Sequence, residues 1–272
     1  MTRSYQILIV GGGAAGLATA ASLHNRDRSL EIAIVEPADK HYYQPGWTMV
    51  GAGIFQKEET CRDMDSVWPA GVERIRNAVK SFDPKNNTVT LNDKTKIGYE
   101  ILIVASGLKL DWDAIEGLTD SLGHNGVTSN YNYDLAPYTW QLVQEFQGKD
   151  AIFTMPGMPI KCAGAPQKAM YLSCDHWQKT GRLSDMNVSF CNAGPVLFGC
   201  ATYVPPLMKY VDKYGINLDF GHNLTKIDGA SKTAWFKVTK EGEEPQMIER
   251  KFDMIHVCPP QCAPDFISKS PL

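Results

Sequence analysis

The sequence predicts an α/β protein made of two tandem Rossmann-like domains. Three observations favour this fold class: an apolar strand that runs into a glycine-rich turn, a second apolar strand that ends in an acid, and a restart of the strand–loop–helix pattern near residue 150. Strands and helices that alternate in this way are typical of a parallel sheet covered by helices. We expect a first domain over residues 1–115, a connecting segment over 116–149 and a second domain over 150–272.

Length and charge limit the possible functions. The chain has 272 residues and a formal net charge of −3. Folding of a chain of this length buries roughly 70–75% of its unfolded surface, which supports a substantial core. The balanced charge argues against a nucleic-acid partner. The sequence contains no apolar run long enough to span a membrane.

The first strand and turn predict a phosphate-binding site. Residues 7–10 read Ile-Leu-Ile-Val and are followed by Gly11-x-Gly13-x-x-Gly16 and a small-residue segment over 14–24 that suits a helix. In such a turn the first glycine allows the tight bend, the second lets a pyrophosphate approach the backbone, and the third allows close helix–strand packing. The amides at the start of the helix would face the phosphates.

The next segments favour FAD over plain NAD. Residues 31–35 form a second apolar strand that ends in Glu36, placed to accept hydrogen bonds from the ribose of an adenosine. Residues 87–91 and 94–99 predict two antiparallel strands, where a dehydrogenase more often has a crossover helix. A further buried strand over 99–104 then ends in Ala105-Ser106-Gly107, which resembles a short signature of flavoproteins.

The second half repeats the pattern with a different loop. We expect strands at 151–155, 187–191, 216–220 and 252–258, a helix that starts near Pro166 and ends near Gly181, and a helix over 202–214. In place of a glycine-rich turn, the loop after the first of these strands holds two prolines, Lys161 and Cys162. Proline offers no N–H to a phosphate, so the loop disfavours NAD(P)H.

Cys162 is the candidate catalytic residue. It lies ahead of a predicted helix N-terminus and beside a lysine, and both features stabilise a thiolate. The alternative, a buried structural cysteine, stays open on position alone. For Cys174 in mid-helix, and for Cys258 and Cys262, we expect packing roles. A zinc site formed by His256, Cys258 and Cys262 is disfavoured because their spacing is loose, so we expect no metal.

Three segments resemble sulfide:quinone oxidoreductases, in particular the branch that includes the mitochondrial enzyme. They are the flavin-facing loop His41–Gly53, the cysteine loop Pro159–Lys168, and the segment His256–Phe266. The resemblance covers essentially the whole chain. It implies two FAD/NAD(P)-binding domains of Rossmann type, with the C-terminal portion of the family fold absent from this sequence.

The resemblance also implies the chemistry. Sulfide would be oxidised at a cysteine pair beside FAD, leaving sulfane sulfur on Cys162, and a ubiquinone-type quinone would take the electrons. The second cysteine of the pair would belong to the absent portion. A small molecule would accept the sulfane sulfur. The residues expected to hold FAD are Gly11, Gly13, Ala14, Gly16, Glu36, Gln44, Ala105, Ser106 and Gly107.

The same resemblance predicts where the protein is located in the cell, and it leaves two alternative functions open. Amphipathic helices in the absent portion would bind the full-length protein peripherally to the bacterial cytoplasmic membrane or the inner mitochondrial membrane, whereas this chain would be soluble. A homo-oligomer is compatible with the sequence. Two alternatives remain: another flavin disulfide reductase-like enzyme such as a type II NADH dehydrogenase, and an inactive nucleotide-binding chain.

Overall fold

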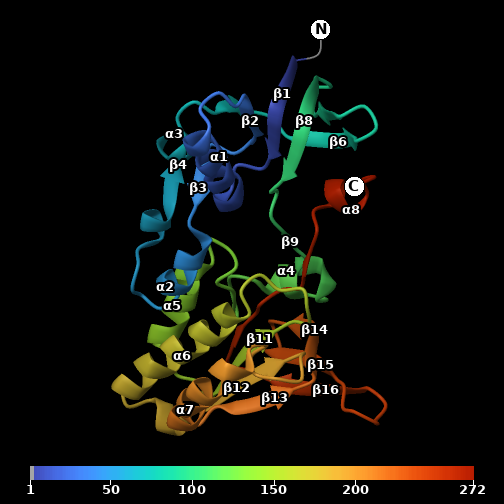
Figure 1. The fold of residues 1–272 in the computed structure, drawn as a ribbon. Coiled ribbons are helices and arrows are strands. Elements are labelled where there is room, and N and C mark those ends of the chain that lie inside the picture. Colours follow the sequence, from blue (N-terminus) through green and yellow to red (C-terminus); the bar gives the residue numbers. More distant parts are fainter. Residues whose placement is uncertain (1–2) are drawn as a thin grey trace. The chain divides into compact units, whose positions relative to one another are not determined.

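A computed structural model describes residues 3–272, and the chain divides into two compact units (Figure 1). Unit 1 comprises residues up to Tyr43 together with Cys61–Lys109 and Ala263–Leu272. Unit 2 comprises Gln44–Thr60 and Leu110–Cys262. Each unit is described by itself below.

Unit 1 is built on a mixed sheet with the strand order β5-β2-β1-β8-β7-β6. Its strands are β1 (Arg3–Val10), β2 (Ile32–Val35), β5 (Glu73–Ile75), β6 (Val79–Asp83), β7 (Thr88–Leu91) and β8 (Lys96–Val104). Strands β5, β2, β1 and β8 pair in parallel, and β7 pairs antiparallel with both β8 and β6. The parallel strands β1 and β2 are nearly continuous apolar runs because both of their faces are covered.

Both faces of this sheet carry core residues. On one face Ile9 and Ile34 pack with Leu17 and Ala20 of helix α1 (Ala14–Arg26). On the other face Leu8 of β1 packs in one cluster with Phe82 of β6 and Val89 of β7. Phe266 of α8 (Asp265–Ser268) stacks on Phe82. Unit 1 also contains the remaining elements β3 (Lys40–Tyr42), β4 (Cys61–Asp63) and α3 (Met64–Val67).

Unit 2 is built on a parallel sheet with the strand order β10-β17-β11-β12-β13. These strands are β10 (Val127–Thr128), β11 (Asp150–Met155), β12 (Asn187–Asn192), β13 (Asn217–Phe220) and β17 (Met254–His256). Helices α5 (Ala136–Glu145), α6 (Gly164–Lys179) and α7 (Val204–Tyr214) contribute Val143, Trp177 and Val211 to the core that covers one face.

An antiparallel sheet covers the other face of unit 2. It consists of β14 (His222–Asp228), β15 (Thr233–Val238) and β16 (Gln246–Lys251), and its Leu224 and Phe236 pack with Ile152 and Ile255 of the parallel sheet. The remaining helices and strands of unit 2 are α2 (Trp47–Val50), α4 (Leu118–Ser121), β18 (Gln261–Cys262) and the 3₁₀ turns at Gln44–Gly46, Lys57–Thr60, Trp112–Ala114, Leu183–Asp185 and Ala201–Tyr203. Strand β9 (Lys109–Leu110) has its first residue in unit 1 and its second in unit 2.

The predicted fold class is confirmed. The strands and helices expected on both sides of the two loops are present within a few residues of their predicted bounds, and Gly215 ends α7 in the left-handed conformation. The three strands of the antiparallel sheet β14–β16 were not predicted. Their segments mix exposed charged residues with apolar ones and show no clear alternation in sequence. The preference of such segments for strand conformation depends on the core that one face of the sheet covers.

The compact units differ from the expected domain boundaries in three places. Residues 116–149, expected as a connecting segment, group with unit 2 because β10 pairs with β17 and α5 buries Val143. Residues 44–60 also group with unit 2, where α2 packs on Ala136 of α5. The last ten residues group with unit 1 through the contact between Phe266 and Phe82.

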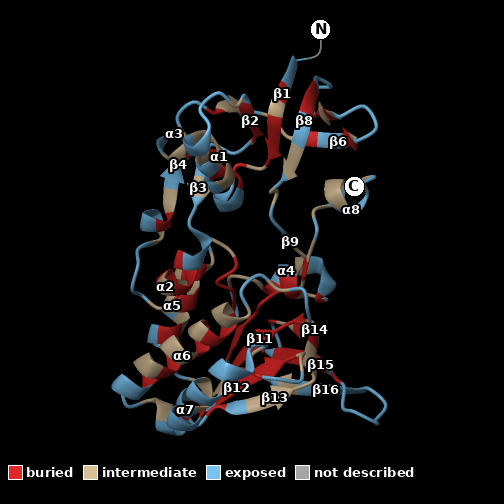
Figure 2. Cartoon of the chain, in the orientation of Figure 1, coloured by how far each residue is buried: buried red, intermediate tan, exposed pale blue. Residues whose placement is uncertain are grey.

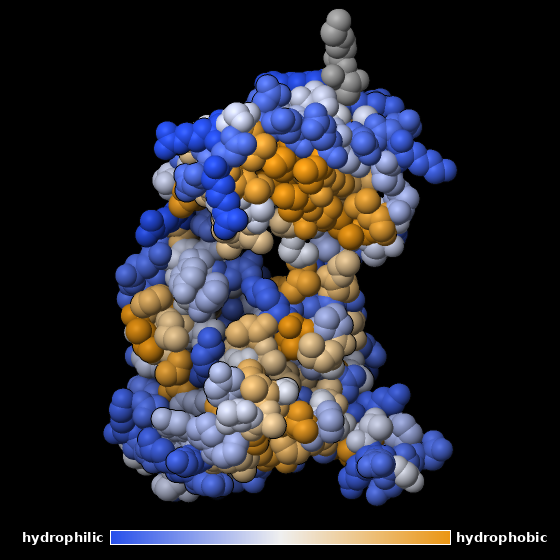
Figure 3. All heavy atoms as spheres, viewed as in Figure 1, coloured by the Kyte–Doolittle hydropathy of each residue, from blue (hydrophilic) through white to orange (hydrophobic). Residues whose placement is uncertain are grey.

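Buried residues concentrate in the central strands of the main sheet of each unit (Figure 2). Figure 3 shows apolar side chains gathered where β8 lies in Figure 1, and there Ile101 and Val104 are 56% and 40% exposed. Among residues 3–272, no helix is long and apolar enough to cross a membrane.

Candidate functional site

The glycine turn between β1 and α1 is shaped by close backbone contacts. Gly11 has a φ of +104°, and a Cβ there would lie 2.5 Å from the carbonyl oxygen of Ala105. A Cβ on Gly16 would lie 1.9 Å from the carbonyl oxygen of Gly11. Glycine is therefore required at both positions, as the sequence pattern predicts.

Gly13 is different because its surroundings are open. A Cβ at Gly13 would have no atom of the chain within 4 Å, and Gly13 and Ala14 are exposed. Gly13 is the N-cap of α1 and no side chain caps the helix, whose first intrahelical bond runs from the Leu17 amide to the Gly13 carbonyl. The amides that precede Leu17 in the helix have no acceptor within it, so they can bind an anion.

Glu36 lies at the end of β2 and closes the other side of the turn. Its Oε2 accepts a 2.7 Å hydrogen bond from the amide of Gly12, and its Oε1 accepts one of the same length from the amide of Ala38. A carboxylate has about four lone-pair positions, so both oxygens can still accept a bond from a ribose hydroxyl.

The segment after β8 completes the site in unit 1. The amide of Ala105 donates a 2.8 Å hydrogen bond to the carbonyl of Val10, which holds Ala105 and Ser106 against the Gly11 turn. Gly107 has a φ of +72° and an exposed position. Unit 1 thus brings together every predicted cofactor residue except Gln44, and its open amides and single acid fit the adenosine diphosphate part of a dinucleotide.

Cys162 lies in the eight-residue loop between β11 and α6 of unit 2. Only three residues separate β1 from α1, so the second loop is not a tight glycine turn. The Cys162 thiol is free and its residue is exposed, with the left-handed φ of +62° that non-glycine residues rarely adopt. The amide of Ala165 donates a 2.9 Å hydrogen bond to the Cys162 carbonyl, which places the cysteine just ahead of α6.

Gln44 is placed beside this loop in unit 2. Its Oε1 accepts a hydrogen bond from the ammonium group of Lys161. Desolvation lowers the pKa of Lys161, and the neighbouring Cys162 opposes that effect. Two of the three segments that carry the predicted family resemblance therefore meet through a pair of side chains.

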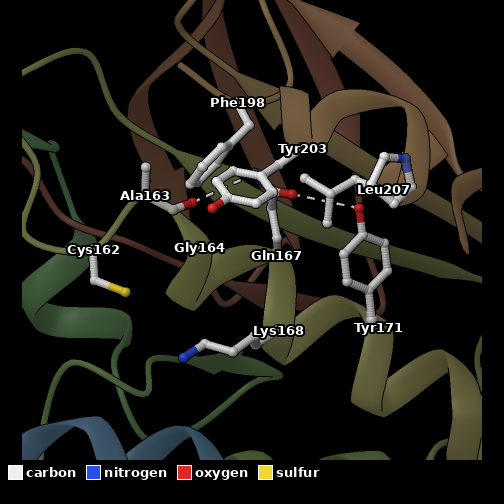
Figure 4. A pocket seen from close by; sticks show the side chains of 10 residues that line it. Cys162, Ala163, Gly164, Gln167, Lys168, Tyr171, Phe198, Tyr203 and Leu207 are labelled. Carbon is white, nitrogen blue, oxygen red and sulfur yellow. Dashed lines mark hydrogen bonds between the residues drawn. The ribbon is translucent and has the colours of Figure 1, made fainter. Parts of the chain in front are cut away.

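A cavity of about 520 Å³ opens beside Cys162. Figure 4 shows Cys162 and Lys168 on the side of the cavity away from the rings of Phe198 and Tyr203. The cavity is lined by Cys162, Ala163, Gly164, Gln167, Lys168, Tyr171, Phe198, Tyr203, Pro206 and Leu207. Its walls are mostly apolar, and a thiol and an ammonium group lie at one end.

Gln167 fixes the wall of this cavity. It is 2% exposed, and its amide nitrogen donates a 2.7 Å hydrogen bond to the carbonyl of Leu197. The hydroxyl of Tyr171 lies 3.4 Å from its Oε1 (Figure 4). The loop that carries Phe198 is thereby tied to α6, so the cavity is preformed.

The other cysteines of unit 2 range from buried to exposed. Cys174 and Cys258 are buried, as expected for packing residues, and burial raises the pKa of each thiol to about 12. Cys262 is partly exposed and Cys200 is exposed. Within the described part of the chain, no three His, Cys, Asp or Glu side chains gather in a way that would hold a metal ion.

Two residues near the cysteine loop were not predicted from the sequence. Gln261 accepts a hydrogen bond from the amide of Lys161, and the hydroxyl of Tyr131 faces the carbonyls of Lys161 and Cys162. They lie 100 and about 30 residues from the loop in sequence. Gln261 belongs to the segment His256–Phe266 that carries the resemblance, whereas Tyr131 belongs to none of the motifs named above. Gln261 stands between Pro260 and Cys262, so a polar residue among less polar neighbours was a weak local signal, and Tyr131 between two asparagines gave no such signal.

Residues 5–138 match the family described as pyridine nucleotide-disulphide oxidoreductase. The chain is 41% identical to the mitochondrial sulfide:quinone oxidoreductase of Dictyostelium discoideum and 36% identical to that of Mus musculus. Both alignments cover 98% of this chain, and 58% and 59% of the relatives. The chain thus spans about three fifths of the length of these curated relatives.

A solved structure of a sulfide:quinone oxidoreductase has a similar fold. The sulfide:quinone oxidoreductase of Aquifex aeolicus superposes with a TM-score of 0.79 at 20% identity, and the match covers 99% of this chain and 61% of that one. The sequence comparisons confirm the predicted resemblance over nearly the whole of this chain, and the solved structure confirms the fold.

Proposed function

We propose that this chain, a homologue of sulfide:quinone oxidoreductases along nearly all of its length, carries the flavin-binding and sulfide-oxidising part of such an enzyme. The observation that carries the proposal is the exposed Cys162 thiol, held in a left-handed backbone conformation ahead of α6. Strained backbone of this kind concentrates at functional sites because it persists only where the surroundings enforce it.

FAD is the cofactor we propose for the site in unit 1. The turn from Gly11 to Gly16 would bind its pyrophosphate, Glu36 would bind its adenosine ribose, and Ala105–Gly107 would lie towards the flavin. Gln44, which belongs to unit 2, stays among the residues that we propose for FAD binding. When bound, FAD supplies the acceptor for the two electrons that leave sulfide, and a quinone takes them in turn.

Cys162 is the residue we propose to hold the oxidised sulfur. Oxidation of hydrogen sulfide to the sulfane level releases two electrons and two protons, and the sulfur atom remains bonded to the cysteine as a persulfide. The positive end of α6 and the ammonium of Lys161 favour negative charge on that sulfur. A second thiol elsewhere in the enzyme would complete the redox pair that the resemblance implies.

The cavity beside Cys162 is the place we propose for the sulfane acceptor. An acceptor thiolate or sulfite would attack the outer sulfur of the persulfide, and the S–S bond would break to release the Cys162 thiolate. The Lys168 ammonium would attract an anionic acceptor, and the apolar walls would exclude water from the reacting atoms.

NADH oxidation is not supported by the second loop. Residues 156–163 contain Pro156 and Pro159, and the eight-residue span offers no tight glycine turn for a pyrophosphate. The two relatives from Dictyostelium discoideum and Mus musculus are sulfide:quinone oxidoreductases. We propose that the enzyme associates with the membrane that holds its quinone, as the mitochondrial relatives suggest.

The test is an anaerobic titration of the purified protein loaded with FAD. Sulfide should bleach the flavin absorbance in the visible range, while an equal concentration of NADH should not. Bleaching by NADH at the same rate would overturn the proposal, and so would a protein that binds no FAD.

A further inference from the structure

We propose that Gln261 and Tyr131 are positioning residues that hold the Cys162 loop in its strained conformation. The inference rests on the proposed role of Cys162. It arises from three hydrogen bonds to the backbone of two adjacent residues, Lys161 and Cys162, and all of the groups involved lie in unit 2.

Gln261 holds the N–H side of this peptide segment. Its Oε1 accepts a 2.5 Å hydrogen bond from the amide of Lys161, and its Nε2 lies 3.9 Å from the sulfur of Cys258. A backbone N–H can only donate, so the orientation of the Gln261 amide is fixed by its partner. Gln261 is 5% exposed, and few water molecules can compete for the bond.

Tyr131 holds the carbonyl side. Its hydroxyl lies 3.4 Å from the carbonyl oxygens of both Lys161 and Cys162. Burial raises the pKa of Tyr131, so the phenol keeps its proton and remains a donor. Two buried side chains that are distant in sequence therefore bind both the amide and the carbonyl of the residue that precedes the cysteine.

Cys258 supports Gln261 without entering the chemistry. Its amide donates a 3.2 Å hydrogen bond to the Thr154 hydroxyl on β11, which fixes the segment that leads to Gln261. Because burial raises the pKa of Cys258 to about 12, its sulfur stays a neutral thiol beside the Gln261 amide. The network therefore connects the rigid end of β11 to the Cys162 loop.

A left-handed residue with a side chain persists only where its surroundings enforce it. If the bonds to Lys161 and Cys162 are removed, the loop can relax to a right-handed conformation, and the Cβ of Cys162 then leaves the backbone in another direction. The favourable field of a helix N-terminus fades within one turn. Displacement of the sulfur therefore slows its reaction with electrophiles.

The test measures the rate at which iodoacetamide alkylates Cys162, with Cys200 of the same molecule as an internal reference. The variants are Gln261→Met, which keeps the volume and removes the acceptor, and Tyr131→Phe, which removes only the hydroxyl. The matched controls are Gln141→Met on the surface of α5 and Tyr138→Phe, whose hydroxyl lies 3.3 Å from the amide of Gly126.

We expect the ratio of Cys162 to Cys200 alkylation to fall about two- to fivefold in both variants and to stay constant in both controls. Gln261→Glu, which can still accept from the Lys161 amide, should restore part of the rate. A ratio that is unchanged or higher in Tyr131→Phe overturns the inference, and this mild variant decides the matter if Gln261→Met does not fold.

The assay needs neither sulfide nor FAD, so the inference and the proposed function can fail separately. If wild-type flavin is bleached by sulfide while the alkylation ratio is insensitive to both variants, only the positioning role is overturned. If the ratio responds but sulfide never bleaches the flavin, only the proposed function is overturned.

Discussion

The amide of Gly12 donates a 2.7 Å hydrogen bond to Oε2 of Glu36, so the acid at the end of the second strand also fixes the first glycine turn. Gly12 is buried, and a Cβ there would lie 2.7 Å from Cγ of Glu36. The residue that we propose to bind the adenosine ribose therefore shapes the pyrophosphate site as well. Loss of Glu36 should therefore weaken the binding of both the ribose and the pyrophosphate of the cofactor.

Replacement of Glu36 by Ala should weaken FAD binding about tenfold or more, because hydrogen bonds to a charged group contribute roughly 1.5–3 kcal/mol each. Fluorescence titration of FAD measures the affinity. Glu31→Ala, an exposed acid just before the same strand, is the control and should bind FAD like the wild type. Equal affinities for the two variants would contradict the assignment of Glu36.

Gly13 and Gly16 form a matched pair for substitution by Ala. The Gly16 Cβ would clash with the Gly11 carbonyl at 1.9 Å, so Gly16→Ala should lower the free energy of unfolding by on the order of 2 kcal/mol. The Gly13 Cβ meets no atom of the chain, so Gly13→Ala should leave the cofactor-free protein as stable as the wild type.

Gly13→Ala should instead reduce FAD affinity, because the added methyl group occupies the space reserved for the pyrophosphate. Thermal unfolding with and without FAD separates the two effects. Normal FAD affinity in Gly13→Ala would show that the open space beside Gly13 is not where phosphate binds.

His256 should make the stability of the protein depend on pH. It is fully buried, its Nε2 accepts a hydrogen bond from the amide of Asn130, and desolvation lowers its pKa from 6.5 to about 4. Between those values the unfolded chain binds a proton that the folded chain does not. Stability is therefore complete above pH 6.5 and falls as the pH drops towards 4, by roughly 3 kcal/mol in all.

Urea unfolding at several pH values measures this dependence. The slope of the free energy of unfolding against pH gives the number of protons taken up on unfolding. In His256→Gln this number should decrease by about one between pH 6.5 and 4, whatever the loss of overall stability. His124→Gln, in a turn of the same unit, serves as the control. A slope that is identical in wild type and His256→Gln would exclude His256 as the titrating group.

Lys168 should affect the sulfane acceptor rather than sulfide. Lys168→Ala removes the ammonium group that lines the cavity, so we expect the KM for sulfite to rise several-fold while sulfide-dependent flavin bleaching is retained. Lys179→Ala, at the far end of α6, should leave both quantities unchanged. Steady-state kinetics with varied sulfite test this. An unchanged KM would mean that acceptors do not approach through the cavity.

The sequence was sufficient to predict the parts of the fold that depend on local pattern. The run at 7–10, the spacing of Gly11, Gly13 and Gly16, and the acid at 36 each have a mechanical role that holds wherever the motif occurs. The turn observed in unit 1 confirms the geometry that this spacing requires. The burial of Cys174 likewise follows from its place within α6, whereas position alone did not decide between an exposed and a buried Cys162.

Other features depend on contacts between distant residues and could not be predicted. Gln261 binds the amide of Lys161 across 100 positions of sequence, and no pattern near either residue indicates the pairing. Gln44 was expected among the cofactor residues, whereas the structure also shows it bound to Lys161. The sheet β14–β16 becomes recognisable only through the core face that it covers.

The most direct test of the proposed function compares Cys162→Ser with Cys200→Ser, a second exposed cysteine of the same unit. Both proteins are loaded with FAD and mixed anaerobically with sulfide, and the flavin absorbance is followed in a stopped-flow instrument. We expect Cys200→Ser to bleach like the wild type and Cys162→Ser to lose the reaction. Bleaching at the wild-type rate in Cys162→Ser would contradict the account.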